Sequence, residues 1–340
     1  MRRHPIVLCL LLGLSMSAAA VAAEPTDPPA SPTALVIHGG AGVIERSALT
    51  PEREQAVRRD MNRALDAGNA ILRRGGSALD AVQAAIVVLE DSPYFNAGKG
   101  AVFNHEGVNE LDASIMDGSS LRAGAVAGVH RVKNPIALAR AVMEHSPHVM
   151  LIGDGAEAFG KTQAGIEFVD PTYFRTDERW QQLQDELQKE QSAAYVPPSS
   201  NYTGTVGAVA LDAQGRLAAA TSTGGMTNKR WGRVGDSPII GAGTYANGDC
   251  AVSGTGWGEF YIRAAVAHDI CARVAYRGDA LALAAEDVVD KIVPALGGDG
   301  GAIALDKAGN IAMPFNTSGM YRAWIKPDGS RGVAIYRDEK

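Results

Sequence analysis

The stretch NYTGTVGAVALD, residues 201–212, places a threonine between a polar segment and a buried-type strand. Thr205 follows a glycine and opens an alternating apolar run, a position that β-branched residues favour in any strand. Upstream, residues 163–204 are polar and charged and end rich in Pro and Ser, which predicts a flexible linker with a helical middle and a disorder-prone end. This pattern is compatible with two roles for Thr205: an ordinary strand residue or a nucleophile.

A threonine gains its own general base when it becomes a new N-terminus. Its hydroxyl attacks, and its α-amine, with a reference pKa of about 7.7–8.0, accepts the proton. An internal threonine has an amide nitrogen instead, so the chain must first be cut between Gly204 and Thr205. Glycine suits that cut because it tolerates the strained torsions that favour attack on its carbonyl carbon. Taken alone, however, Gly-Thr before a strand favours the ordinary structural interpretation.

The pattern on both sides of Thr205 predicts antiparallel sheets covered by helices, an α+β fold. Thr50 is the expected N-cap of a first helix, and Ser77 opens a second one. We expect strands at 33–42, 111–118, 123–132, 148–153, 205–212, 216–223, 250–254, 301–306, 310–315, 320–325 and 332–337. The expected helices are 51–74, 77–89, 134–145, 257–278 and 280–296.

Composition places the chain among exported globular proteins. Residues 1–23 carry two arginines, an apolar core and small residues before Ala23, which is the layout of a cleaved signal peptide and predicts secretion, in a Gram-negative host to the periplasm. Net charge is −6 with no basic block, which argues against nucleic acid as a partner, and nothing predicts a membrane span once the leader is removed. Of the remaining cysteines, we expect Cys250 and Cys271 to be buried free thiols rather than a disulfide.

Several short motifs do not predict a site. GAEAFGKT, residues 155–162, matches a P-loop pattern, but Asp154 and Glu157 bring negative charge and the loop residues prefer helix. The carboxylates of Glu110, Asp112 and Asp117 are expected to cap turns rather than act as acids and bases. His38, before the glycines of HGGAG, is the histidine we expect nearest to a site, although a structural role is favoured.

The residues after the proposed cut decide between these interpretations. GTVGAVALDAQGRLAAATSTGGMTNKRWGRVGDSPIIGAGTYAN, residues 204–247, resembles the plant-type asparaginase and isoaspartyl peptidase family of N-terminal-nucleophile hydrolases. The resemblance covers nearly all of the chain after the leader, in order, except the polar segment before Thr205. It continues through HGGAG, YFNAGKGAVF, ELDASIMDG, AGAVAGV, NPIALARAVM, SGTGWGE, GGDGGAIALD and PFNTSGMYRAW.

The resemblance implies a role for each matching residue. Thr205 takes the place of the nucleophile, and Thr223 that of the threonine that hydrogen-bonds it. Arg233 and Asp236 match the substrate clamp, whose chemistry suits the α-carboxylate and α-ammonium of an amino acid. The remaining matches are the oxyanion pair Thr255 and Gly256, the substrate-binding Gly258, and Asn96 near the scissile bond.

The resemblance also implies the architecture. We expect a four-layer αββα sandwich, cut into an α chain of residues 24–204 and a β chain of residues 205–340, and assembled as a dimer of αβ units. The implied reaction is hydrolysis of L-asparagine and of β-aspartyl dipeptides through an acyl-enzyme on Thr205, with no cofactor for catalysis.

A structural sodium ion is the one metal that the resemblance implies. Two departures lie near the implied sites: Lys99 stands in the sodium loop and Trp257 stands in GTGWG, where smaller residues are usual. The backbone carbonyls expected to hold the ion belong to Val87, Glu90, Ser92, Phe95, Ala97 and Lys99.

Two other functions remain open at this stage. A glycosylasparaginase-like amidase would share fold and nucleophile, but its usual His-Asp-Thr at the cut is absent, because Gly204 precedes Thr205. A secreted amino-acid-binding protein would use Arg233 and Asp236 equally well and would stay one intact chain on a denaturing gel.

Overall fold

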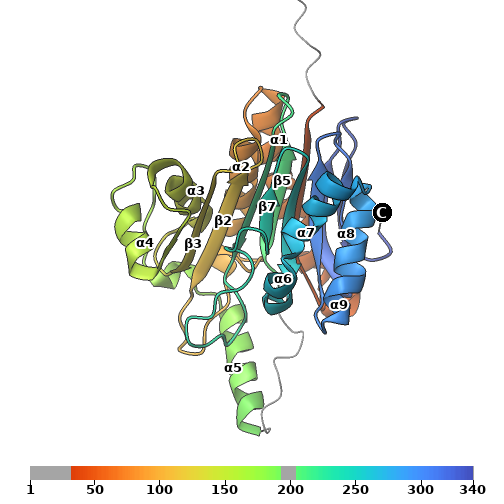
Figure 1. Ribbon diagram of the computed structural model, residues 1–340. Helices are drawn as coiled ribbons and strands as arrows, with labels where there is room; N and C mark the ends of the chain where they lie inside the picture. Colours follow the sequence, from red (N-terminus) through yellow and green to blue (C-terminus); the bar gives the residue numbers. More distant parts are fainter. Residues whose placement is uncertain (1–31, 193–203, 340) are drawn as a thin grey trace, which may run out of the picture. The chain divides into compact units, whose positions relative to one another are not determined.

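Two β-sheets face each other in the computed structural model, which describes residues 32–192 and 204–339 (Figure 1). Within these residues the large sheet has the strand order β12-β11-β1-β5-β6-β2-β3-β4 and the small sheet the order β10-β9-β8-β7. Neighbouring described strands are antiparallel except β3 and β4, as the hairpin spacing of the sequence predicts. The strands of the large sheet are β1 (Ala34–Gly42), β2 (Leu111–Asp117), β3 (Ala123–Val129), β4 (Met150–Ile152), β5 (Val206–Leu211), β6 (Leu217–Thr223), β11 (Gly319–Ile325) and β12 (Arg331–Tyr336). Those of the small sheet are β7 (Thr244–Ala246), β8 (Cys250–Gly256), β9 (Gly300–Asp306) and β10 (Ile311–Ala312).

Helices cover the outer face of each sheet. α1, α2 and α3 pack against the large sheet, and α7 and α8 pack against the small one. The order helix, sheet, sheet, helix is the four-layer αββα sandwich that the sequence predicts. The helices are α1 (Pro51–Arg73), α2 (Ala78–Glu90), α3 (Pro135–His145), α4 (Gly153–Gly160), α5 (Asp177–Ser192), α6 (Gly258–Ala264), α7 (Val266–Ala272), α8 (Leu281–Glu286) and α9 (Val293–Ala295).

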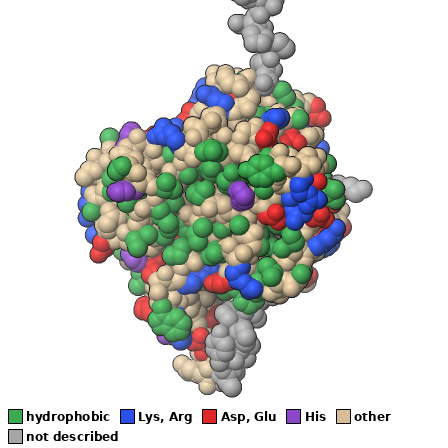
Figure 2. All heavy atoms as spheres, in the orientation of Figure 1, with side chains coloured by type: hydrophobic (Ala, Val, Ile, Leu, Met, Phe, Trp, Pro, Cys, Tyr) green, Lys and Arg blue, Asp and Glu red, His purple; other side chains and the backbone are tan. Residues whose placement is uncertain are grey.

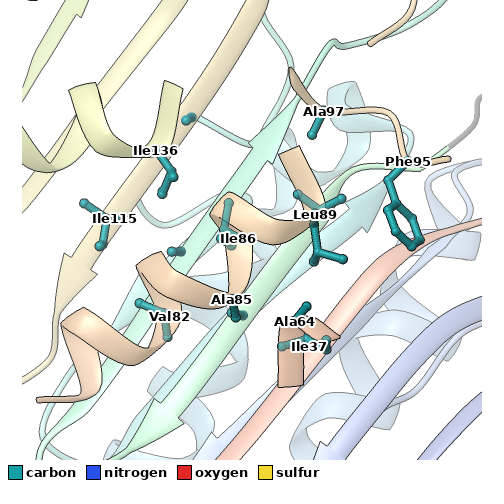
Figure 3. Close-up of a cluster of buried hydrophobic side chains, with 14 of the residues drawn as sticks. Ile37, Ala64, Val82, Ala85, Ile86, Leu89, Phe95, Ala97, Ile115 and Ile136 are labelled. Atoms are coloured by element: carbon teal, nitrogen blue, oxygen red, sulfur yellow. The ribbon is translucent and has the colours of Figure 1, made fainter. Parts of the chain in front are cut away.

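The helices on the large sheet begin where the capping signals predict. The Thr50 hydroxyl accepts a hydrogen bond from the Arg53 amide at 3.2 Å, and the Ser77 hydroxyl accepts one from the Asp80 amide at 3.1 Å. Such caps satisfy backbone donors that have no partner inside the helix. α2 then turns an apolar face toward the sheet, where it packs among side chains from β1, β2 and α3 (Figure 3). Its buried side chains include Val82, Ala85, Ile86 and Leu89.

The strand that follows Thr205 is buried on both faces. All six residues of β5 are buried, between α2 on one side and the small sheet on the other. The sequence of such a strand is a continuous apolar run, because neither face of the strand is exposed to solvent. The start of β5 is therefore held rigidly between the two central layers.

The structure corrects two expectations about the chain after β7. Cys250 on β8 and Cys271 on α7 form a disulfide, with their Cα atoms 5.3 Å apart, and are not free thiols. Sequence spacing could not show this, because the pair meets only when α7 packs on β8. The helix expected over 257–278 is also divided: Ala265 adopts a left-handed φ of 48° between α6 and α7.

The expected flexible linker of residues 163–204 is folded where it is described. Its predicted helical middle is α5, and Arg179 of this helix is only 1% exposed. A polar composition therefore does not prevent this segment from docking through a few anchors, and its flexibility stays a prediction. The predicted leader, residues 1–23, and the predicted disorder-prone end, residues 193–203, lie outside the described residues.

No helix in the described part of the chain is both long enough and apolar enough to cross a bilayer.

Candidate active site

Thr205 and Thr223 lie side by side at one end of the central strands. The Thr205 hydroxyl donates to the Thr223 hydroxyl oxygen at 3.1 Å, and both side chains are buried. Strand pairing explains the contact: Val206 of β5 lies opposite Ser222 of β6, so the two threonines face each other one position further along. The pair that the sequence assigned to nucleophile and supporting hydroxyl is brought together by the structure.

The turn after Thr223 fixes its hydroxyl group. The Gly225 amide donates to Thr223 Oγ1 at 3.0 Å. Asn96 holds this turn from the opposite side, because its Nδ2 donates to the Gly225 carbonyl at 2.7 Å and its Oδ1 accepts from the Val102 amide at 3.0 Å. Asn96 therefore positions Thr223, and both ends of its side chain are occupied in doing so.

The backbone of Gly204 packs directly against Gly40 of β1. A Cβ atom on either glycine would collide with the Cα atom of the other, and Gly40 has a φ of 109°, which favours glycine. The residue before Thr205 must therefore be small for the chain to reach β5. The sequence suggested glycine for its torsional freedom, and the structure adds this close approach to a second glycine.

His38 holds the other side of Thr205. Its Nδ1 lies 3.1 Å from the Thr205 carbonyl oxygen, and its Nε2 lies 2.9 Å from the Ser253 hydroxyl. A carbonyl only accepts, so Nδ1 carries the hydrogen and Nε2 accepts from Ser253. Complete burial lowers the pKa of His38 to about 3, so the ring is neutral. The histidine that the sequence placed near a site contacts Thr205 itself, in the structural role that was favoured.

Thr255 and Gly256 end β8 beside the same segment of β1. The Ala41 amide donates to Thr255 Oγ1 at 3.1 Å, which leaves the Thr255 hydroxyl hydrogen free to point elsewhere. A Cβ on Gly256 would press on Gly300 and on the Tyr261 ring, so this position needs glycine. The segment from His38 to Ala41 thus touches Thr205 on one side and the predicted oxyanion residues on the other.

Arg233 and Asp236 place a cation and an anion beside Gly258. A Cβ on Gly258 would lie 2.8 Å from an Arg233 guanidinium nitrogen and 2.8 Å from Asp236 Oδ1, so the missing side chain leaves room for both groups. Asp236 is 4% exposed, and its Oδ2 has no hydrogen-bond partner among the described residues. Such an arrangement complements a zwitterionic amino acid.

Burial raises the pKa of Asp236 to about 6, against the attraction of Arg233. Arg233 already has a partner that the sequence did not suggest. Its Nε and Nη2 donate to the two carboxylate oxygens of Glu259 at 2.9 and 2.8 Å. Glu259 therefore orients the guanidinium, and an incoming carboxylate must use its remaining N–H groups.

The sequence interpretation also missed the site's buried charges. Asp112 lies opposite Thr223 in the β2–β6 register, and its Oδ1 accepts from the Gly128 amide at 2.8 Å. Burial raises the pKa of Asp112, and the nearby charge of Lys229 opposes that shift. Lys229 is itself buried beside the Thr223–Gly225 turn and donates to the Glu110 carbonyl at 3.0 Å. Asp112 caps a backbone amide as expected, but only strand register reveals that it lies next to Thr223.

The loop after α2 has the chemistry of a site for a hard cation. Backbone carbonyl oxygens of Glu90 and Phe95 pack closely against Gly98 and Gly100, where a side chain on either glycine would collide with them. Oxygen ligands of this kind suit a hard cation, and the described residues hold no competing cluster of three His, Cys, Asp or Glu side chains. The Lys99 ammonium lies 5.4 Å from the centroid of the Tyr173 ring, a cation–π contact.

Comparison with known proteins agrees with this geometry. The family model described as Asparaginase matches residues 31–335. A protein named isoaspartyl peptidase from Escherichia coli (strain K12) is 51% identical over 313 residues, which cover 90% of this chain and 96% of that protein. A probable isoaspartyl peptidase/L-asparaginase 2 from Arabidopsis thaliana is 41% identical over 89% of this chain and 98% of its own length. A plant-type L-asparaginase from Pyrococcus abyssi is 43% identical over 86% and 96%, respectively.

The neutral, buried His38 predicts a pH dependence of stability. Its folded pKa of about 3 lies below the ordinary value of 6.5, so below pH 6.5 the unfolded chain binds a proton that the folded chain excludes. The free energy of unfolding should therefore fall as the pH drops from about 6.5 toward 3, by up to about 1.4 kcal/mol per pH unit from this group. Urea unfolding at pH 7 and pH 4.5 should show a smaller loss in His38→Gln than in wild type. The exposed His148→Gln is the control, and equal losses in all three proteins would contradict the assignment.

Proposed function

The chain belongs to the asparaginase family, and we propose that it works through Thr205 as a new N-terminal nucleophile. It is a hydrolase of the isoaspartyl peptidase/L-asparaginase type, which acts on isoaspartyl dipeptides and L-asparagine. Neither a glycosylasparaginase nor a non-cleaving binding protein is favoured, since the relatives carry the peptidase and asparaginase names. The observation that carries the residue assignment is the hydrogen bond from Thr205 to Thr223 at the start of a rigid, buried strand.

Self-cleavage comes first in this mechanism. Thr205 Oγ attacks the Gly204 carbonyl carbon, and the peptide C–N bond breaks as its nitrogen takes up the hydroxyl proton and becomes the Thr205 α-amine. Water then hydrolyses the resulting ester, which releases the Gly204 carboxylate and restores the Thr205 hydroxyl. Thr223 accepts the hydrogen bond from the attacking hydroxyl and so orients it. His38 holds the Thr205 carbonyl, so the residue stays in place while the bond before it is broken.

Substrate hydrolysis then repeats the attack on a side-chain amide. The free α-amine of Thr205 takes the hydroxyl proton, Oγ bonds to the amide carbon, and the C–N bond breaks as ammonia or an amine leaves with that proton. Water hydrolyses the acyl-enzyme, releases the aspartyl product and restores the hydroxyl. Donors are needed where negative charge develops on the amide oxygen, and the Thr255 hydroxyl and Gly256 amide supply them in this proposal.

Arg233 and Asp236 bind the backbone end of the substrate, beside Gly258. The α-carboxylate pairs with free N–H groups of Arg233, and the α-ammonium pairs with Asp236. Support comes from the unpartnered Oδ2 of Asp236 within the described residues and from the room left by Gly258. The reaction needs no cofactor in this scheme.

A structural sodium ion belongs to the same proposal. Carbonyls of the loop over residues 87–99 would hold it and stiffen the loop that carries Asn96, which positions Thr223. The close packing of the Glu90 and Phe95 carbonyls against Gly98 and Gly100 supports this assignment, because it places carbonyl oxygens within this loop. Thermal unfolding in sodium chloride should occur at a higher temperature than in choline chloride of equal ionic strength, and identical curves would rule the ion out.

Assembly and export complete the proposal. The active form is a dimer of αβ units in the periplasm, and the leader is removed near Ala23. Hydrophobic side chains gather across the middle of one face (Figure 2), and exposed apolar residues also lie on edge strand β4 and directly before it. Light scattering gives the mass of the assembly, and N-terminal sequencing of exported protein gives the start of the α chain. A mass of one αβ unit, or an intact Met1, would contradict the respective claim.

Removal of the Thr205 hydroxyl should abolish both cleavage and activity. Thr205→Ala should remain a single chain on a denaturing gel and should not release ammonia from asparagine, because no attacking group is left. Thr205→Ser keeps a hydroxyl and should still cut, more slowly than wild type. If the alanine variant gave the same two fragments as wild type, Thr205 would not be the nucleophile.

Loss of Arg233 should weaken recognition but not self-cleavage. A hydrogen bond to a charged group is worth about 1.5–3 kcal/mol, so Arg233→Ala should lose roughly 10- to 200-fold in kcat/KM for asparagine. Arg233→Lys should restore part of this loss, because an ammonium cannot form a bidentate pair. The α-amide of asparagine, which lacks the α-carboxylate, serves as the control substrate on processed enzyme. Equal losses on both substrates would mean that Arg233 does not read the carboxylate.

A further inference from the structure

Helix α5 is the last described element before the cut, and it docks onto the body of the protein at several points. Arg179 is buried, and its Nε donates to the Gly100 carbonyl at 2.8 Å. The preceding residue, Glu178, forms an ion pair with Arg53 of α1 at 2.8 Å. A guanidinium is costly to bury, so the burial of Arg179 indicates that α5 is firmly docked against the rest of the protein.

An aromatic contact joins the same helix to the loop before β2. The Trp180 ring meets Phe103 edge to face, with centroids 5.3 Å apart, and the Arg175 guanidinium lies 4.0 Å from the Trp180 centroid. Gly107 leaves room for the Trp180 ring, because a Cβ at this position would lie 3.1 Å from the indole. α5 is thus fixed to the loop over residues 100–108.

That loop in turn holds the segment leading to Arg233, here called the clamp loop (residues 226–233). The Asn228 amide donates to the Phe103 carbonyl at 2.9 Å, and the His105 amide donates to the Lys229 carbonyl at 2.9 Å. α5 also reaches the clamp loop directly, through the 2.6 Å ion pair between Glu190 and Arg230. In Figure 1, α5 projects from the sandwich beside the loops that precede β2 and follow β6.

The clamp loop needs such support. Asn228 and Trp231 adopt left-handed φ angles of 64° and 56°, a conformation that asparagine tolerates but that is strained for a bulky residue such as tryptophan. Trp231 is also 93% exposed, so its side chain gains little from packing. Conformations of this kind persist when the surroundings enforce them, and here the surroundings are the 100–108 loop and α5.

We propose that α5 is a positioning element of the mature enzyme: it stays docked after the cut and holds the clamp loop so that Arg233 meets the substrate. The residues upstream of the cut then serve recognition as well as processing. The link to recognition rests on the proposed function of Arg233, whereas the docking of α5 does not.

The first experiment measures hydrogen exchange on processed wild-type enzyme and on Trp180→Ala. Amides of α5 should stay protected in the processed wild type, and exchange over residues 226–233 should accelerate in the variant. Trp180→Phe keeps an aromatic ring and should restore most of the protection. Fast exchange throughout α5 in processed wild type would overturn the proposal, and so would unchanged exchange over 226–233 in Trp180→Ala. This readout applies to the uncut chain as well, so it does not depend on activity.

The second experiment measures kinetics on the same variants and on a matched pair of substitutions in α5. Trp180→Ala should raise KM for asparagine roughly 3- to 10-fold with kcat changed less than about 2-fold, and its self-cleavage should match wild type. Glu190→Gln, which breaks the ion pair to Arg230, should raise KM by about 2-fold. Glu186→Gln, which alters a pair with Lys189 on the same helix, should leave KM unchanged. A faster-exchanging clamp loop with unchanged KM would overturn the role in recognition. Absence of any hydrolysis in wild type would instead contradict the proposed function.

Discussion

The close contact between Gly40 and Gly204 is the constraint on which the rest of the site depends. Because neither residue has a side chain, the chain before Thr205 can pass directly against β1. β1 is also the strand that supplies His38 to the Thr205 carbonyl and the Ala41 amide to Thr255. One short segment therefore sets the positions of Gly204, Thr205 and Thr255, the proposed scissile residue, nucleophile and oxyanion residue, relative to one another. A larger residue at either glycine would separate groups that must act within one reaction.

The hydrogen bonds around Thr205 continue into the fully buried interface between the two sheets. His38 accepts from Ser253, and Ser253 lies 2.7 Å from the Thr221 hydroxyl, so hydrogen-bonding groups continue from Thr205 toward the interior. Buried polar groups are stable only when they are paired, and a paired network fixes one orientation for each member. His38 must be neutral for this network to form, because a charged ring has a hydrogen on both nitrogens and its Nε2 could not accept from Ser253. The result is that Thr205, the proposed nucleophile, is held in place before any substrate arrives.

The proposed substrate clamp, Arg233 and Asp236, is not fully paired in this way. Asp236 is buried with an oxygen that lacks a partner among the described residues, and burial raises its pKa to about 6. A buried carboxylate without full pairing is costly, and an incoming ammonium group relieves that cost. Glu259 pre-orients Arg233 without occupying all of its N–H groups. Thr205 is thus fully positioned without a ligand, whereas the charges of Arg233 and Asp236 would be fully paired only when a ligand binds.

Local sequence determined much of this protein: the capped starts of α1 and α2, the strands, the antiparallel layers and, through contiguous motifs, the pair Thr205 and Thr223 with the clamp residues Arg233 and Asp236. These features depend on neighbours along the chain, where propensity and periodicity act. Tertiary structure alone decided the contacts between distant segments: Gly40 against Gly204, Glu259 on Arg233, Asp112 opposite Thr223, and the disulfide between Cys250 and Cys271. It also showed that α5, whose polar composition suggested a flexible linker, is docked through the buried Arg179. The physical reason is the same in each case: strand register and helix packing choose these partners, and neither can be read from the residues on one side of the contact.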